Sequence, residues 1–237
     1  MKSYKFYDLI MALFVTVLLV SNIASSAKIV DWGVSALGLR LSFDAGTLLF
    51  PISYIFGDVL TEVYGYHRSR RVIWVGFGAL ALMSVALWLV GRLPGEFGWA
   101  ESVGDAAYDA VLGGVSGLAV ASLLAYFLGE FSNSFVLAKL KVKTGGRYLW
   151  VRTVGSTLVG EGVDSIAFVT VACLLGVFPW EIAASLIVAN YVFKVFIEVA
   201  MTPLTYRVVA FLKRTENEDY YDIATDFNPF KLEASRG

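Results

Sequence analysis

Pairs of carboxylate side chains recur at helical spacing inside apolar stretches of this sequence. Asp58 and Glu62 are four residues apart, and Glu161 and Asp164 are three apart. Residues at these spacings lie on one face of a helix. An ionised group in the middle of a membrane-spanning helix costs about 2.5–3.5 kcal/mol on insertion scales, so it normally faces a bundle interior or water. We therefore expect these acids to face a polar site that handles a solute.

Other apolar stretches carry polar residues at the same spacings. Glu130 and Asn133 lie one turn apart in GEFSNS, and Asn190, Lys194 and Glu198 follow one another at i, i+4. The deep acids are Asp58, Glu130, Glu161, Asp164 and Glu198, against one deep base, Lys194. Such an excess predicts an interior that attracts cations, holds some carboxylates protonated, or does both.

Structural roles remain open for several of these residues. Glu62 lies about two turns from a basic segment, so an interfacial ion pair with Arg68, Arg70 or Arg71 explains it as well as a binding role does. Asn133 is also explained by a polar clamp between helices. Lys194 could pair with Glu198 within its own helix, or neutralise one of the two acids Glu161 and Asp164 but not both.

The elements that must position these residues are membrane helices. The chain has 237 residues, of which 57% are hydrophobic and 16% charged, and its mean hydropathy is +0.68; these values indicate an integral membrane protein. A crossing needs about 20 apolar residues. The stretches of that length are Tyr7–Ala27, Asp44–Tyr64, Val72–Gly91, Val111–Leu137, Arg152–Phe178 and Glu181–Phe211.

We therefore predict an all-α membrane protein built as a six-transmembrane-helix bundle. Residues 1–212 form the six-helix transmembrane domain, and residues 213–237 form a polar cytoplasmic tail. The connection Arg92–Ala110, rich in Gly and acidic residues, is expected to be a loop or a surface helix. The lipid bilayer is the expected surroundings of the domain.

The distribution of Lys and Arg sets the expected orientation. Alternate connections gather fourteen basic residues on one side and three on the other, and short cytoplasmic loops carry the basic excess. Both termini are thus predicted to be cytoplasmic. The basic side has Lys2, Lys5, Arg68, Arg70, Arg71, Lys139, Lys141, Lys143, Arg147, Arg152, Lys213, Arg214, Lys231 and Arg236; the other has Lys28, Arg40 and Arg92.

Two weaker patterns concern symmetry and assembly. GDVLTE in the second stretch and GEGVDS in the fifth occupy matching places in two sets of three helices. Three spans per half would invert one half relative to the other, so these fragments suggest an inverted 3+3 repeat. The spacing Gly113–Gly117 predicts a close helix contact, either within the chain or across a homodimer.

Several function classes lack the residues that they need. The single Cys173 and single His67 cannot form a disulfide or a Cys/His metal cluster within one chain. No phosphate-binding loop or hydrolase motif occurs, and a net charge of −1 provides no field for nucleic acid. We expect no enzyme activity, cofactor, metal or nucleic-acid partner; an intramembrane aspartyl enzyme is a minor alternative.

Several motifs in order make a family resemblance specific. FPISYIFGDVLTEVYGYHRSRR, GEFSNS, GEGVDS, NYVFKVFIEVAMTPLTYRVV and the tail motif DFNPF, spread from Asn22 to Phe230, together resemble the queuosine precursor transporter family of vitamin-uptake-like membrane proteins. The resemblance implies import of a 7-deazaguanine, in the nitrile or the aminomethyl form, across the cell inner (cytoplasmic) membrane for tRNA modification. A multi-pass membrane location and a small-molecule substrate are therefore expected.

The resemblance also suggests roles for the candidate residues. A carboxylate can accept two N–H donors in parallel from a guanine-like edge, a role given to Glu161 or Asp164, while Asp58 or Glu198 would hold an ammonium or a coupled proton. Asparagines would bond the carbonyl and ring nitrogens, and Phe168, Tyr191 and Phe193 join the stacking candidates. The predicted substrate-binding residues are Asn22, Phe50, Tyr54, Asp58, Glu62, Glu130, Asn133, Glu161, Asp164, Asn190, Lys194 and Glu198.

Two other functions compete with a self-sufficient carrier. The chain could be the substrate-binding membrane subunit of an ATP-driven vitamin or nucleobase uptake system, because an ATPase would have to be a separate subunit. A structural or assembly protein is a third class, which predicts that the deep acids can be replaced in pairs without loss of function.

Overall fold

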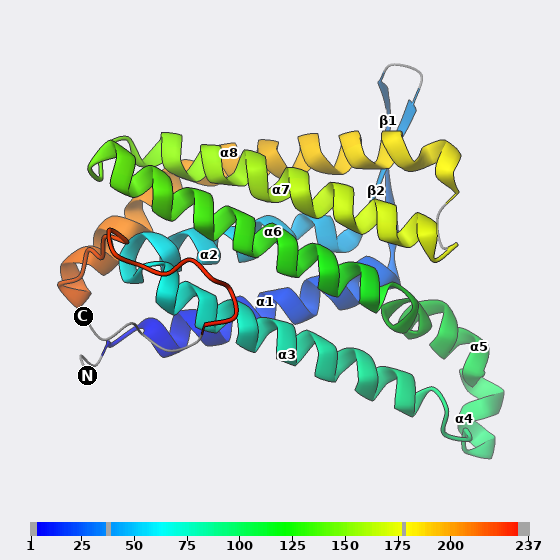
Figure 1. Ribbon diagram of the computed structural model, residues 1–237. Helices are drawn as coiled ribbons and strands as arrows, with labels where there is room; N and C mark the ends of the chain where they lie inside the picture. The colour runs from blue at the N-terminus through cyan, green and yellow to red at the C-terminus, as the bar shows by residue number, and fades with distance from the viewer. Residues whose placement is uncertain (1–3, 37–38, 177–178, 232–237) are drawn as a thin grey trace.

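Helices that run back and forth along one axis make up most of the molecule (Figure 1). The computed structural model describes residues 4–36, 39–176 and 179–231, without the side chains of residues 29, 31–44, 50–51, 114–119 and 182. The main helices are α1 (Tyr7–Ala27), α2 (Phe50–Tyr64), α3 (Tyr66–Val90), α6 (Gly114–Thr144), α7 (Leu149–Leu174) and α8 (Ala183–Glu216). Successive main helices alternate in direction, so α1 begins and α8 ends at the same end of the bundle, here called the terminal end.

Five of these helices, all except α2, are long and apolar enough to cross a membrane. The prediction of a continuous helix over Asp44–Tyr64 is wrong in its first part: Asp44 ends a strand, Ala45–Leu48 is the 3₁₀ turn η1, and α2 begins only at Phe50. Pro51 stands in the first turn of α2, where its missing N–H leaves no bond unmade. At 15 residues α2 is about 22 Å long, shorter than a hydrocarbon core of about 30 Å.

The other helices enclose α2, which contacts α1, α3, α6 and α8. Its residues from Ser53 to Tyr64 are almost all buried. A helix in this position meets protein on its sides rather than lipid, so it tolerates more polar side chains than a lipid-facing helix does.

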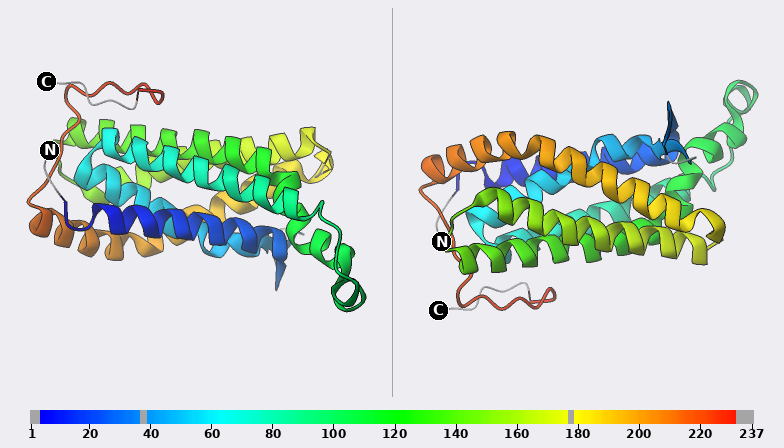
Figure 2. Two further views of the ribbon diagram at one scale, coloured as in Figure 1. Left: turned by 90° about the horizontal axis from the view of Figure 1, so that it is seen from below. Right: turned by 90° about the horizontal axis from the view of Figure 1, so that it is seen from above.

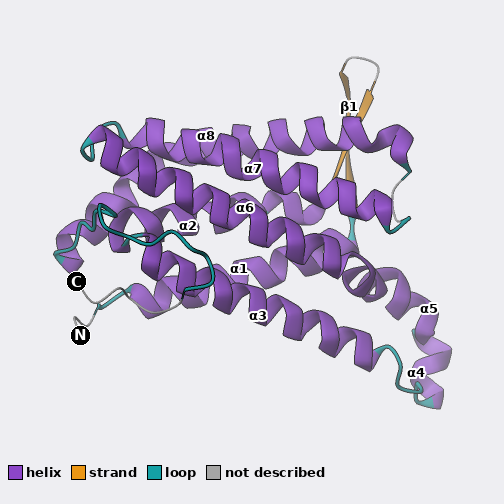
Figure 3. Cartoon of the chain, viewed as in Figure 1, coloured by secondary structure: helices purple, strands orange, loops and turns teal. Residues whose placement is uncertain are grey.

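A β-hairpin follows α1 at the end opposite the termini, here called the hairpin end (Figure 3). Its antiparallel strands are β1 (Ile29–Ala36) and β2 (Leu39–Asp44), and Ile29 pairs with Asp44. The hairpin differs from the predicted all-helical fold, in which residues 29–44 are divided between a loop and the start of the second span.

Short helices also project from the hairpin end, beyond the bundle (Figure 2). They are α4 (Phe97–Ser102) and α5 (Gly104–Tyr108), followed by the π-helical turn η2 (Asp109–Gly113), while the 3₁₀ turn η3 (Trp180–Ile182) precedes α8. Glu96 begins α4 by accepting a hydrogen bond from the Trp99 backbone N–H at 2.9 Å. The prediction of a loop or surface helix between Arg92 and Ala110 fits this arrangement.

Glycines bring α6 and α7 into direct backbone contact. A Cβ added to Gly160 would lie 2.7 Å from the Asn133 Cβ and 3.1 Å from the Gly129 carbonyl oxygen. Only a residue without a side chain permits this approach. The contact sets the polar residues of α6 directly beside those of α7.

At the terminal end, α8 holds the start of α1. The Glu216 carboxylate accepts the backbone N–H groups of Lys5 at 2.9 Å and Phe6 at 2.7 Å. The N-terminal N–H groups of a helix have no partner within the helix, and a carboxylate there is favourable. Phe6 has no side-chain cap of its own, so the last turn of α8 supplies one.

Candidate functional site

Four helices bring the predicted deep acids together in the bundle interior. Asp58 lies on α2, Glu130 and Asn133 on α6, Glu161 and Asp164 on α7, and Lys194 and Glu198 on α8. We call these seven residues the carboxylate cluster. All of them are buried except Asp164, which is partly buried.

Asp58 and Asn133 connect α2 to α6. The Asn133 amide Nδ2 donates to Asp58 Oδ1 at 2.7 Å, and both side chains are 0% exposed. Asn133 lies against Gly160, so the same amide sits at the closest point of the α6–α7 contact. Asn133 therefore connects two helices, as the clamp alternative predicts, and the residue that it binds is one of the acids.

Lys194 lies between the two acids of α7. Its Nζ is 2.6 Å from Asp164 Oδ2 and 3.2 Å from Glu161 Oε2. The alternative of a self-contained Lys194–Glu198 pair is wrong, because neither Glu198 oxygen has a hydrogen-bond partner among the described residues. One ammonium thus touches both acids while supplying a single positive charge.

Glu130 and Glu198 have no donor at all within the described part of the chain. Both oxygens of each carboxylate are buried without a hydrogen bond. Glu130 Oε2 lies against α2, 2.9 Å from where a Cβ on Gly57 would stand. Glu198 interacts electrostatically with Asp58, Glu161 and Glu130. Glu130 and Glu198 therefore belong to the cluster, but unlike Asp58, Glu161 and Asp164 they have no amide or ammonium partner among the described residues.

Tyr54 places an aromatic ring beside the acids. The ring is buried on α2, and its hydroxyl lies 2.6 Å from where a Cβ on Gly129 would be. In the described structure this hydroxyl has no hydrogen-bond partner, and the same holds for the hydroxyls of Ser53, Thr157 and Ser165. Buried polar groups are normally satisfied, so this region has spare capacity to bond a polar solute.

Not every predicted site residue joins the cluster. Asn22 is buried on α1, and its amide donates to Leu18 O of its own helix at 2.8 Å. Asn190 is half-buried on α8, one turn from Lys194, and the Tyr191 ring lies close to Gly162 of α7. The side chain of Phe50 is outside the described residues.

Glu62 belongs to a second group of charges near the terminal end. Its Oε1 accepts from Arg152 Nη2 and Lys213 Nζ, both at 2.6 Å, and Lys141 Nζ is 3.6 Å away. The alternative of an ion pair was therefore right in kind, but its predicted partners Arg68, Arg70 and Arg71 were wrong. Glu62 joins four helices, a structural role.

The chain after α8 packs against this charge group. Lys141 also donates to Asp219 Oδ1 at 2.5 Å and to Tyr220 O at 2.7 Å, and Lys213 lies 2.9 Å from Asp219. Partial burial of Asp219 raises the pKa of its carboxyl, but hydrogen bonds from Lys141 and Lys213 outweigh this and leave the pKa below its usual value. The tail is thus docked by charge.

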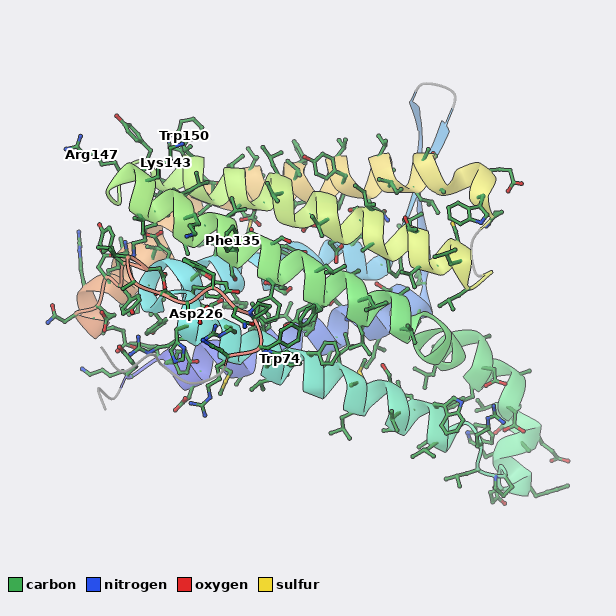
Figure 4. All side chains as sticks on the ribbon, viewed as in Figure 1. Trp74, Phe135, Lys143, Arg147, Trp150 and Asp226 are labelled. Carbon is green, nitrogen blue, oxygen red and sulfur yellow. The ribbon has the colours of Figure 1, made fainter. Side chains whose placement is uncertain are left out.

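The DFNPF motif continues along α3 and α6 (Figure 4). Arg70 donates to the carbonyl oxygens of Asp226 and Asn228, and Trp74 Nε1 donates to Pro229 O at 2.8 Å. The Lys139 ammonium lies 4.1 Å from the centre of the Phe227 ring. The sequence predicts Arg70 and Lys139 only as charges of cytoplasmic loops, whereas both contact the tail. The DFNPF motif is the sequence signal for these contacts.

A surface groove of about 260 Å³ lies between α1 and α8, away from the carboxylate cluster. Apolar side chains and one guanidinium line it: Phe6, Ile10, Arg207, Val208, Phe211 and Leu212. None of these residues carries a carboxylate, so the groove lacks the side-chain acceptor that a guanine-like donor edge would pair with.

Comparisons with known proteins point to a family of membrane transporters. Residues 44–208 match the model of the family described as "Putative vitamin uptake transporter". A "Probable queuosine precursor transporter" of Bacillus subtilis is 26% identical over 167 residues, 70% of this chain and 71% of the relative. One of Haemophilus influenzae with the same description is 29% identical over 168 residues, 69% of this chain and 67% of the relative.

No solved structure matches the chain. The family match covers more than half of it and contains every member of the carboxylate cluster. The chain therefore belongs to the vitamin uptake transporter family, the queuosine precursor transporter family that its motifs resemble.

Proposed function

We propose that this protein imports 7-deazaguanine precursors of queuosine, such as the nitrile and aminomethyl forms, across the cytoplasmic membrane for tRNA modification. One observation carries the proposal: buried acids from α2, α6, α7 and α8 meet beside one lysine and a buried tyrosine. The descriptions of the two relatives support the substrate class.

The chemistry of a 7-deazaguanine fits such a cluster. Its guanine-like edge presents parallel N–H donors, which a carboxylate accepts in a bidentate arrangement. Glu161 and Asp164 are our candidates for this edge, and Lys194 beside them has an ammonium that can donate to the ring carbonyl. The Asp58–Asn133 pair offers a further acceptor and a further amide.

Aromatic side chains would hold the flat ring. Tyr54 is buried beside Gly129, and Tyr191 lies against Gly162, the residue that follows Glu161. Stacking on an aromatic face adds about 1–3 kcal/mol per base in nucleic-acid complexes. Tyr54 and Tyr191 are therefore our first stacking candidates.

The membrane arrangement is part of the proposal. We infer six crossings with both termini in the cytoplasm, because the basic terminal end contains Arg152, Lys141 and Lys213 and basic ends face the cytoplasm. The buried α2 together with η1 would form the second crossing. The inner membrane, an inverted 3+3 repeat and a homodimer through Gly113–Gly117 also belong to this proposal.

The test is uptake of labelled precursor by the purified chain in liposomes. We expect Glu161→Gln and Asp164→Asn each to abolish measurable uptake, because a charge-assisted hydrogen bond contributes about 1.5–3 kcal/mol and each 1.4 kcal/mol is a factor of ten in affinity. The matched control is Glu101→Gln on the exposed helix α4, which should keep wild-type uptake. Normal uptake by both cluster variants would remove these acids from the site.

The same preparation separates a carrier from a dependent binding subunit. A subunit of an ATP-driven system would bind precursor but would not move it without its ATPase. Binding measurements with the nitrile, the aminomethyl form, the free queuine base and guanine then define selectivity. Equal affinity for guanine would contradict a specific queuosine precursor carrier.

A further inference from the structure

The members of the carboxylate cluster differ sharply in how their negative charge is balanced. Asp164 and Glu161 share Lys194, and Asp58 accepts the Asn133 amide. Glu130 and Glu198 accept nothing from any described residue. A protein interior penalises an ionised carboxylate severely unless it is paired and hydrogen-bonded.

Among the described residues of the cluster, the one positive charge is shared by two other acids. The cluster contains five acids and one base, Lys194, which already lies within 3.2 Å of two carboxylates. The charged and titratable side chains that act on Glu130 and Glu198 come from α2, α6, α7 and α8. They are Asp58 and Tyr54 from α2, Tyr126 from α6, Glu161 and Asp164 from α7, and Lys194 from α8.

Both side chains are removed from the membrane-facing surface. Glu130 is 0% exposed and Glu198 is 1% exposed. Glu130 lies against Gly57 of α2, next to Asp58, and Glu198 follows Lys194 by one helical turn on the same face of α8. Each therefore adjoins a residue that we place at the substrate.

We propose that Glu130 and Glu198 form a proton-binding site that couples substrate movement to the proton gradient. The inference rests on the proposed function and assigns these two acids to the proton, leaving Glu161 and Asp164 for the guanine-like edge. In this state the carboxyls are neutral, which removes the cost of two uncompensated buried charges. Each proton binds a carboxylate oxygen, crosses with the substrate, and leaves on the other side.

The proximity of the two groups makes coupling physically direct. Glu198 interacts electrostatically with Asp58, Glu161 and Glu130, so a proton on one acid changes the charge felt by the substrate acceptors. A ligand that donates hydrogen bonds to Glu161 or Asp164 in turn changes the cost of ionising Glu130 and Glu198. Such mutual dependence is the thermodynamic requirement for coupling.

The experiment uses liposomes containing the full-length protein, with the membrane potential held at zero. Counterflow exchange of labelled precursor, measured without a pH gradient, tests the proposed function by itself. An inward gradient of one pH unit should then raise accumulation about tenfold for each proton carried, since one pH unit is 1.36 kcal/mol and 1.4 kcal/mol is tenfold. A trapped pH dye should report acidification that depends on substrate.

Gln replaces a protonated carboxyl with a neutral group of the same shape. We expect Glu130→Gln and Glu198→Gln to reduce the gradient-driven accumulation ratio to about one while exchange falls far less. Glu101→Gln is the control and should keep the full gradient response. Glu161→Gln should instead lose exchange of the precursor, because it removes an acceptor of the substrate.

Two results would overturn the inference while leaving the proposed function intact. One is wild-type exchange of precursor with no response to the pH gradient and no substrate-dependent acidification, a measurement that needs no variant. The other is a full gradient response in both Glu130→Gln and Glu198→Gln. Absence of wild-type exchange of every 7-deazaguanine would overturn the proposed function and the inference that rests on it.

Discussion

At the scale of single residues, buried glutamates of this protein have opposite surroundings. Glu62 and Glu130 are both 0% exposed. Glu62 has three cationic groups around one oxygen, whereas Glu130 has no hydrogen-bond donor among the described residues. Burial alone therefore does not reveal what a carboxylate does; its partners do. Glu62 holds helices together, and Glu130 is one of the two acids to which we assign a proton.

Replacing Glu62 should test its structural role. We expect Glu62→Gln to destabilise the protein by about 3–5 kcal/mol, because removing one partner of a buried ion pair leaves the other charges uncompensated. Arg152 and Lys213 would remain without their carboxylate. Thermal unfolding in detergent measures the change.

The control for Glu62 is an exposed pair in the same chain. Lys231 lies 2.6 Å from Asp226, and both side chains are largely in solvent. Lys231→Gln should alter stability by at most about 1 kcal/mol. Equal effects of the two substitutions would contradict the role of Glu62 as a buried junction.

At the scale of elements, the contact of α6 with α7 sets the geometry of the cluster. Gly129 and Gly160 allow the two backbones to meet, and Asn133 lies at that point while donating to Asp58. The position of an acid on α2 thus depends on glycines in two other helices. Close small-residue contacts of this kind are typical of membrane helix pairs.

A methyl group at Gly160 should therefore disturb both stability and binding. In Gly160→Ala the new Cβ would lie 2.7 Å from the Asn133 Cβ, and we expect a loss of about 1–3 kcal/mol from overpacking. Displacement of Asn133 should also weaken precursor binding. Thermal unfolding and equilibrium binding measure the two effects.

Gly78→Ala provides the matched control. Gly78 lies on the exposed face of α3, and nothing stands within 4 Å of its added Cβ. Alanine there should be neutral or stabilising by up to about 1 kcal/mol. Equal stability and precursor binding in Gly160→Ala and Gly78→Ala would contradict the idea that the α6–α7 contact positions the carboxylate cluster.

At the scale of the whole molecule, the two ends of the chain close one end of the bundle. Tyr4 OH donates to Glu218 Oε2 at 2.6 Å, and Glu216 accepts the N–H groups that begin α1. Partial burial and the Glu218 hydrogen bond raise the pKa of Tyr4 to about 12. Asp219 then connects the tail to Lys141 and Lys213, which also surround Glu62.

Docking of the tail should depend on the charge of Asp219. Its folded-state pKa lies below the usual value, which is about 3.9 for Asp, so its contribution is complete at neutral pH and is lost as the pH falls through the folded-state pKa. We expect Asp219→Asn at pH 7 to reproduce the effect of acid. Hydrogen exchange of the Tyr220 N–H, which donates to Val63 O, reports the docking.

Tail docking has its own control. Asp226→Asn removes the exposed bond to Lys231 but keeps the backbone carbonyl that Arg70 contacts. Protection of the Tyr220 N–H should therefore change little in this variant. Protection that is unaffected in Asp219→Asn would show that aromatic packing, rather than charge, holds the tail.

The sequence by itself determined the class of protein, most of the long helices and the family. Long apolar stretches need a bilayer or a core, and α1 occupies the predicted Tyr7–Ala27 without change. Spacing also placed Glu161 with Asp164 and Asn190 with Lys194 on shared faces, because helical periodicity is local. Recurring motifs then identified the family, which requires no coordinates.

Only the tertiary structure decided which charges meet. Asp58 finds Asn133 across 75 residues of chain, Lys194 joins Asp164 across 30, and Glu62 joins Lys213 across 151. The spacing of residues within one helix cannot predict these pairs, because each pair joins two different helices. The pairs form because the helices pack at glycine contacts and the tail folds back onto the bundle. The same cause separates the unpartnered acids Glu130 and Glu198 from the structural acid Glu62, although in the sequence all three are a carboxylate within an apolar stretch.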